Sequence, residues 1–488
     1  MTVSDDTAGG HQRRVFSSMS TGISSTIVVS ILGAISVRAM TTRLGATAFG
    51  IFVLVQAYVS LAQTFTDLGL AQVLQRDIAR GDKDERLLLS HAMGLRVTLG
   101  LLAIPVAGAL GLLIYSGQST TMRIGLVLLL FSIPFAVAQE VAAAHFSAQL
   151  RNSILAVGSI MQQVVFVGLV IFAVSLHKSV VFCLGAALIG AIASSIFTTA
   201  MARREVSFTP SYNRVVWFSM LKTSTPIGVA YIIGLLYFKA DTLILSFLAT
   251  TKQIGFYGVA YSVVAVFLVF PSTFTRTFLP SMVRATKETI EETVHSALRY
   301  YAIGGTFGAT AIMICGPTVV RIVAGSHFGA SVPPMRILGA GLIFIFLGSG
   351  ISSVCISRGF GNKIFVVSLV GLVLNVVLNV LAIPKFGING AATATFVCEI
   401  ISLAMFVRLV RRDIQVRIRV LRPLAKPFTA GVLTCAVLAP IYLRGDLRII
   451  YGLILMPVTC IVYFVTLAIL RGFPPELVAY VRKSIVKK

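Results

Sequence analysis

The residues of this chain best suited to chemistry are three cations inside long apolar stretches: Arg38, Lys239 and Arg276. A charged side chain at the centre of a bilayer costs about 2.5–3.5 kcal/mol, so such residues tend to face a water-filled cavity or a partner. Arginine can hold a phosphate through two parallel hydrogen bonds, whereas lysine acts as a point charge. The three cations therefore suit an anionic group within the membrane. The alternative is that Arg38 and Arg276 extend their charges to the nearby interface.

Three acids also lie within apolar stretches: Asp67, Asp241 and Glu399. Glu399 lies about ten residues into its stretch, near the middle of the bilayer, where a short carboxylate cannot reach water. An acid in that position can be protonated, paired, or part of a pathway that couples transport to an ion. We interpret the three acids as candidate ion-coupling residues. For Glu399 the alternative is a neutral, hydrogen-bonded structural acid.

Other polar residues in the apolar stretches have simpler interpretations. Asn375 and Asn379 share one helix face, and we expect them to form hydrogen bonds between helices. Glu140 and His145 lie near the end of a stretch, where a role at the membrane interface is expected. Arg96 is the remaining cation inside a stretch, and the sequence assigns it no role.

The elements that must position these residues are membrane-spanning helices. The chain has 488 residues, of which 57% are hydrophobic and 12% charged. Each apolar stretch is too long for a membrane-spanning strand, which predicts an all-α polytopic membrane protein of about 14 transmembrane helices. The predicted helices are residues 17–40, 48–67, 90–114, 122–145, 154–175, 179–201, 218–245, 255–278, 301–323, 334–356, 362–383, 389–410, 427–443 and 449–470.

The basic residues predict how the helices are oriented. Six basic residues near the ends of the predicted spans are counted with the adjoining gap: Lys222, Lys363, Arg408, Arg123, Arg321 and Arg336. Of the 41 Lys and Arg residues, 28 then fall in every second gap or in the two tails, and 9 fall in the other gaps. Basic loops stay in the cytoplasm, so both termini are predicted to be cytoplasmic in a multi-pass protein of the inner (plasma) membrane. The net charge of +24 is explained by this topology, and no nucleic-acid partner is predicted.

The predicted helices divide into two lobes, which are followed by two further helices. We predict an N-terminal lobe of six helices at residues 1–216 and a C-terminal lobe of six helices at 217–426. Two further helices and a basic cytoplasmic tail follow at 427–488. The lobes would form a parallel pseudo-repeat, and transporters often bind substrate between such repeats. The basic run from Arg408 to Lys426 is interpreted as a positive-inside anchor, with binding of anionic lipid headgroups as the alternative.

Sequence motifs of enzymes are missing. The chain has no GxxxxGK[ST] nucleotide loop, no HExxH and no GxSxG. The six cysteines lie within apolar segments without a CxxC pair, which indicates neither a disulfide framework nor a metal site. We therefore predict a protein that is not an enzyme and has no cofactor, metal or catalytic residues.

Several motifs resemble those of the polysaccharide-repeat-unit (O-antigen) flippases. These proteins belong to the multidrug/oligosaccharidyl-lipid/polysaccharide (MOP) exporter superfamily. The resemblance covers roughly residues 15 to 410, and its last motif is the most specific. The motifs are Arg43-Leu44-Gly45, Phe49-Gly50, Asp67-Leu68-Gly69-Leu70, Arg76-Asp77-Ile78-Ala79, Lys239-Ala240-Asp241, Gly255-Phe256-Tyr257, Gly361-Asn362-Lys363, Asn375, Asn379 and the run from Ile383 to Ala392.

The resemblance implies a fold, a substrate and partners. Two six-helix lobes would enclose a cavity that alternates between the two sides of the membrane. The substrate would be an undecaprenyl-pyrophosphate-linked oligosaccharide, moved from the inner to the outer leaflet. A polymerase and glycosyltransferases of the same pathway would be partners. One departure is Lys239, where relatives often carry arginine.

Three other functions remain open. Peptidoglycan lipid II flippases carry charges early in the first helix, where this chain has Ser24 and Ser25. Drug/cation antiporters of the same superfamily use early acidic residues that are missing here. A non-transporting membrane scaffold for glycan assembly fits the hydropathy, but it leaves the intramembrane charges without a role.

Overall fold

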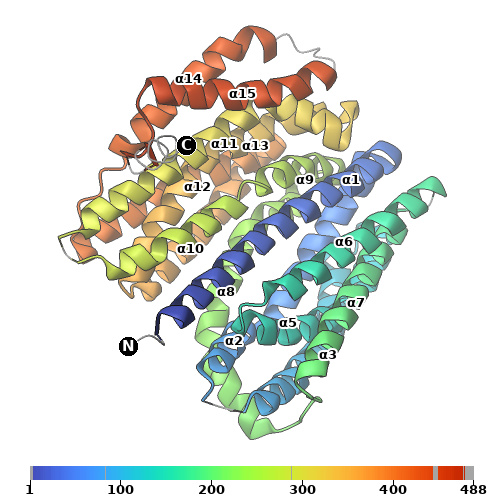
Figure 1. Ribbon diagram of the computed structural model, residues 1–488. Helices are drawn as coiled ribbons and strands as arrows, with labels where there is room; N and C mark the ends of the chain where they lie inside the picture. The colour runs from blue at the N-terminus through green and yellow to red at the C-terminus, as the bar shows by residue number, and fades with distance from the viewer. Residues whose placement is uncertain are drawn as a thin grey trace. The chain divides into compact units, whose positions relative to one another are not determined.

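The computed structural model describes residues 4–82, 84–177, 179–286, 288–442, 449–475 and 477–478. Lys83, which lies between the predicted spans 48–67 and 90–114, and residues 479–488 of the predicted basic tail lie outside the described residues. The described residues form helices and connecting turns without a β-strand, and twelve helices are long and apolar enough to cross a membrane. The prediction of an all-α polytopic membrane protein is confirmed (Figure 1).

The chain forms two compact units, one ending at Lys239 and the other beginning at Ala240. In Figure 1 the first is coloured blue to green and the second yellow-green to red. The division falls inside α8 (Arg214–Leu248). The lobe boundaries at residues 216 and 426, and the parallel pseudo-repeat, stay predictions.

The first unit contains seven helices and most of α8. Its core lies where α2, α3, α5 and α7 meet, around buried Leu74, Met93, Phe146 and Phe208. The seven helices are α1 (Ser4–Asp67), α2 (Leu70–Arg80), α3 (Glu85–Ile114), α4 (Thr120–Leu130), α5 (Ile133–Ala148), α6 (Asn152–Ser175) and α7 (Val180–Glu205).

The second unit contains the end of α8 and the remaining helices. The last two helices pack on α11, where the Tyr463 hydroxyl lies 2.6 Å from the Thr306 hydroxyl. The helices are α9 (Thr251–Ala265), α10 (Val269–Arg284), α11 (Ile290–Ala324), the 3-10 helix η1 (Ser326–Ser331), α12 (Val332–Ser357), α13 (Gly361–Leu409), the π-helix η2 (Val410–Ile414), α14 (Leu421–Tyr442) and α15 (Ile449–Ile469).

Helix α1 contains two predicted spans, and the chain folds back between them. Gly33 lies beside Gln163, and the Phe52 ring stacks on Phe166 with 5.8 Å between centroids. A straight helix would separate residues 33 and 52 by about 28 Å, whereas residues 163 and 166 lie within one turn. The reversal occurs at Gly45, whose φ of 81° favours glycine. This glycine belongs to the first motif of the family resemblance.

Two other predicted spans are interrupted near proline. The span at 122–145 is divided into α4 and α5, with Pro134 in the first turn of α5. The span at 255–278 is divided into α9 and α10 before Pro271. A proline removes one backbone hydrogen bond and clashes with the carbonyl four residues earlier, which explains both breaks. By contrast, α3 continues through Pro105 and α8 through Pro226.

Helix α2 was not predicted. It occupies the gap between the predicted spans 48–67 and 90–114, and it buries Leu70, Val73 and Leu74. These residues have the i, i+3, i+4 spacing of one helix face, which was the available signal. The helix ends at Arg80 and is followed by Gly81, whose φ is 72°.

Candidate functional site

One buried acid of the second unit is Asp241 on α8, which is 4% exposed. Its carboxylate accepts hydrogen bonds from the hydroxyls of Tyr257 and Thr395, each at 2.5 Å. It also accepts from the amide groups of Asn379 at 2.8 Å and Asn375 at 3.2 Å. All four donors are neutral, so hydrogen bonds stabilise the carboxylate while no cation compensates its charge among the described residues.

The fold of α13 brings three of these donors together. Asn375 and Thr395 would be about 30 Å apart on a straight helix, yet both contact Asp241. The helix reverses at Gly387, which has a φ of 57°, so its two halves lie beside each other. The expectation that Asn375 and Asn379 form interhelical hydrogen bonds is confirmed, since both bind an acid on α8.

The surroundings of Asp241 contain further polar groups. The Oδ1 atom of Asn379 is buried and has no hydrogen-bond partner among the described residues. Glu399 lies one helical turn after Thr395 and is half-buried. Tyr261 stacks beside Tyr257, with 6.5 Å between ring centroids. The site thus offers several oxygen atoms and an uncompensated buried acid.

A second buried cluster, in the first unit, joins Arg96 to two acids. The Arg96 side chain is fully buried, and its Nη2 atom lies 3.0 Å from Oδ1 of Asp67. The same Nη2 atom forms an ion pair with Glu140, whose side chain is 50% exposed. The cluster therefore connects the end of α1 with α3 and α5, and its formal charge is −1. Sequence reasoning missed this role of Arg96, although Glu140 in a neighbouring span was a possible signal.

Local structure fixes Asp67 in this cluster. Its Oδ1 atom accepts a hydrogen bond of 3.0 Å from the backbone N–H of Ala71, one of the N–H groups in the first turn of α2 that have no partner within the helix. The turn between α1 and α2 lies directly against α8, where a Cβ atom on Gly69 would come 2.7 Å from the carbonyl oxygen of Ser224. On the facing helix, a Cβ atom on Gly228 would collide with the backbone of Leu68. Two facing glycines therefore permit this close contact.

A third cluster contains His145, which is only 1% exposed. Its Nδ1 lies 2.5 Å from Glu85 and its Nε2 lies 3.2 Å from Glu205. Glu205 also forms an ion pair of 2.5 Å with Arg151. His145 is therefore a buried link between the ends of α3, α5 and α7, and its expected role at the membrane interface stays a prediction.

The three cations predicted to bind an anionic group lie on different helices. Arg38 is exposed on the first half of α1, Lys239 is half-buried on α8, and Arg276 is exposed on α10. Whether they share one aqueous space stays a prediction. No group of three or more His, Cys, Asp or Glu side chains in the described part of the chain has an arrangement that could hold a metal ion.

Comparison with solved structures defines the class of this fold. The lipid II flippase MurJ in an inward closed conformation aligns with a TM-score of 0.78 at 15% identity, covering 91% of this chain and 97% of that chain. An inward-facing multidrug resistance MATE family transporter of the MOP superfamily aligns with a TM-score of 0.61 at 14% identity, covering 86% and 95%. The chain therefore has the fold of MOP-superfamily transporters.

The sequence comparisons identify the family. The profile described as "Polysaccharide biosynthesis protein" matches residues 17–286, more than half of the chain, and the chain belongs to this family. The "Probable low-salt glycan biosynthesis flippase Agl15" of Haloferax volcanii is 24% identical over 370 residues, covering 72% of this chain and 74% of the relative. The "Capsular polysaccharide biosynthesis protein CapF" of Staphylococcus aureus is 20% identical, covering 61% and 76%. The resemblance found in the sequence motifs is confirmed.

Proposed function

We propose that this protein is a flippase that moves lipid-linked polysaccharide repeat units from the inner to the outer leaflet by alternating access. The observation that carries the proposal is the family match over residues 17–286. That region contains Arg38, Lys239 and Arg276, as well as Asp67 and Asp241. One relative from Haloferax volcanii is named a probable glycan biosynthesis flippase, and a second is named a probable flippase. Both names support the same activity.

The proposed substrate is an undecaprenyl-pyrophosphate-linked oligosaccharide. A pyrophosphate needs compensating charge in a low-dielectric cavity, because the energy of an unpaired charge rises steeply as the dielectric constant falls. Arg38 and Arg276 can each present a planar fork to phosphate oxygens, and Lys239 adds a point charge. These three cations are the proposed substrate-binding residues. The chemistry required of the protein is binding and orientation, so no catalytic residue or cofactor is proposed.

Asp67, Asp241 and Glu399 are the proposed ion-coupling residues, and their surroundings differ. Asp67 is ion-paired with Arg96, so its charge is compensated at close range. Asp241 is surrounded by neutral donors, so a proton or a monovalent cation would relieve its buried charge. Glu399 lies beside this cluster on α13. We propose Asp241 as the principal coupling acid, with Glu399 as the residue that exchanges the ion with it.

The proposed setting is the inner (plasma) membrane with both termini in the cytoplasm. The asymmetric distribution of 28 against 9 basic residues supports this orientation. In this orientation a glycan made in the cytoplasm by glycosyltransferases would be delivered to a polymerase on the other side. These enzymes are the proposed partners in the pathway.

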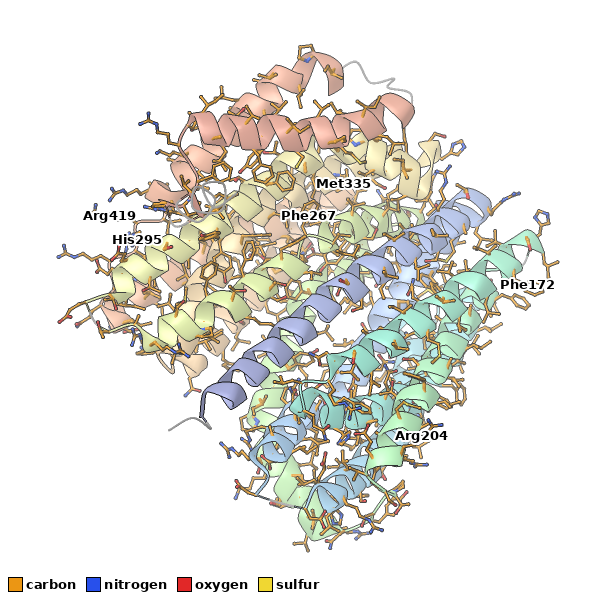
Figure 2. The ribbon with its side chains drawn as sticks, in the orientation of Figure 1. Phe172, Arg204, Phe267, His295, Met335 and Arg419 are labelled. Atoms are coloured by element: carbon orange, nitrogen blue, oxygen red, sulfur yellow. The ribbon has the colours of Figure 1, made fainter. Side chains whose placement is uncertain are left out.

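The proposal is tested in cells whose export of a defined lipid-linked glycan depends on this protein. Neutralising each proposed cation (R38A, K239A and R276A) should abolish export while protein abundance stays near normal. K239R should retain more export than K239A, because the charge is kept. The control is R204A, which removes an exposed arginine at the end of α7 (labelled in Figure 2).

If export continues in all three variants, the proposed substrate-binding site is wrong. The three cations would then only extend their charges to the membrane interface. Export lost equally in R204A would indicate a general effect of charge on insertion. Rescue of a lipid II transport defect, with no effect on glycan export, would favour the lipid II flippase.

A further inference from the structure

The described part of the second unit contains a pocket that the proposed transport site does not use. It has a volume of about 930 Å³ and lies where α13 ends, η2 turns and α14 begins. We call it the basic pocket. It is lined by Ile400, Leu403, Ala404, Val407, Arg408, Arg411, Arg412, Arg419, Val420 and Leu421.

One wall of the basic pocket is formed by the end of the segment from Val416 to Leu421, and several contacts hold this segment in place. Val416 and Ile418 are buried, and the Arg411 guanidinium donates a 2.6 Å hydrogen bond to the Ile418 carbonyl. The backbone N–H of Arg419 donates to the His295 imidazole at 3.2 Å, and Figure 2 shows these two residues side by side. The position of this wall is therefore fixed by hydrogen bonds to both η2 and α11.

Two acids beside this segment are already engaged. Asp413 forms an ion pair of 2.6 Å with Lys363, and Glu291 accepts a hydrogen bond of 2.8 Å from the backbone N–H of Arg417. The lining itself contains no acidic residue. None of the four lining arginines forms an ion pair with another described residue. A charge of +4 thus faces the pocket, and no acidic side chain among the described residues forms an ion pair with it.

The other wall is apolar and belongs to a membrane-spanning helix. The apolar wall follows one face of α13, where Leu403, Ala404 and Val407 occur at helical spacing. This face leads from the arginines toward the centre of the membrane-spanning helix. A ligand for this pocket needs a compact anionic head and a hydrocarbon chain. Guanidinium groups bind phosphate through paired hydrogen bonds, so a phosphate is a suitable head group for this pocket.

We infer that the basic pocket binds an anionic phospholipid of the surrounding membrane. Its phosphate lies among the four arginines and one hydrocarbon chain lies along the α13 wall. Basic pockets beside transmembrane helices recognise phospholipid headgroups by the same combination of charge and apolar contact. By contacting residues on both sides, the bound lipid stabilises the segment that connects α13 to α14. This inference does not depend on the transport substrate.

The test is native mass spectrometry of the delipidated, full-length protein titrated with phosphatidylglycerol and, separately, with phosphatidylcholine. R412Q/R419Q should weaken binding of phosphatidylglycerol about 25-fold, because each basic residue contributes about fivefold to binding an anionic lipid. A404W should also weaken it, because the larger side chain fills the apolar part while all charges remain. The matched control is R417Q/R422Q, which removes two exposed arginines of the same segment that do not line the pocket.

Equal weakening in the control pair would overturn the inference, since it would reveal only general attraction to a basic surface. Binding of phosphatidylcholine as tight as that of phosphatidylglycerol would also contradict it. A third arm adds undecaprenyl pyrophosphate. If that lipid displaces phosphatidylglycerol at lower concentration and loses affinity in R412Q/R419Q, the pocket belongs to a polyprenyl lipid and the assignment to a membrane phospholipid is wrong.

Discussion

Replacing Asp241 by alanine should destabilise the second unit much more than replacing it by asparagine. In D241A the Tyr257 hydroxyl and the Asn375 amide lose the acceptor that they have in the structure, and both residues are about 1% exposed. Each buried donor left without an acceptor costs about 1–3 kcal/mol, so the expected loss is about 2–6 kcal/mol. Asn379 keeps its hydrogen bonds to the Asn375 backbone and side chain and is not counted.

In D241N the amide can replace most of these contacts. Its oxygen accepts from the two asparagines, while its NH2 group donates to the hydroxyls of Tyr257 and Thr395, which can rotate to accept. The expected loss is about 1 kcal/mol, the net value of one hydrogen bond. Asparagine cannot bind a proton at this position, so ion-coupled transport should be lost although the protein remains folded.

The assay is thermal unfolding of the purified protein in detergent, followed with a dye that becomes fluorescent on reaction with thiols. It suits this chain because Cys398 is buried on α13 beside the cluster. At about 2–4 °C per kcal/mol, D241A should lower the midpoint by at least about 4 °C, and D241N by less than about 4 °C. If D241A unfolds at the wild-type temperature, the carboxylate does not organise these four donors and the proposed coupling site is wrong.

Three further predictions concern the first unit and the topology. R96M should lower the unfolding free energy by about 3–5 kcal/mol, because it leaves a buried carboxylate without its cation, and R96K should recover part of the loss in the same unfolding assay. G228A should destabilise the protein by about 1–3 kcal/mol through a backbone collision, whereas G234A, on the same helix with open space around it, should not; equal midpoints would refute the close contact. Reporter fusions after Lys178 and after Lys488 should lie on opposite sides of the membrane, and finding both on one side would overturn the predicted number of crossings between them.

The helices could be predicted from the sequence because their signal is strong and local. A run of about 20 apolar residues has few folded alternatives in a membrane, and its hydropathy is visible without knowledge of its neighbours. The reversals at Gly45 and Gly387 fall between predicted spans and within the motifs of the family resemblance. Helix α2 was missed because its apolar face is short and lies in a basic gap.

The clusters were less predictable, because they depend on contacts between distant parts of the chain. The sequence singled out Asp241 and the pair Asn375 and Asn379 separately, but their joining requires the hairpin of α13 against α8. Arg96 was visible as an intramembrane charge, yet its partners are 29 and 44 residues away. The partners of His145, Glu85 and Glu205, could not be predicted because they come from two other helices, α3 and α7.

The most direct test of the central claim is translocation of a fluorescently labelled undecaprenyl-pyrophosphate oligosaccharide by the purified protein in proteoliposomes. The wild-type protein should move the labelled lipid to the opposite leaflet, and R38A/K239A/R276A should reduce the rate at least tenfold, whereas R204A should leave it unchanged. A protein that does not translocate the labelled lipid, or a triple variant that translocates it at the wild-type rate, would contradict the account.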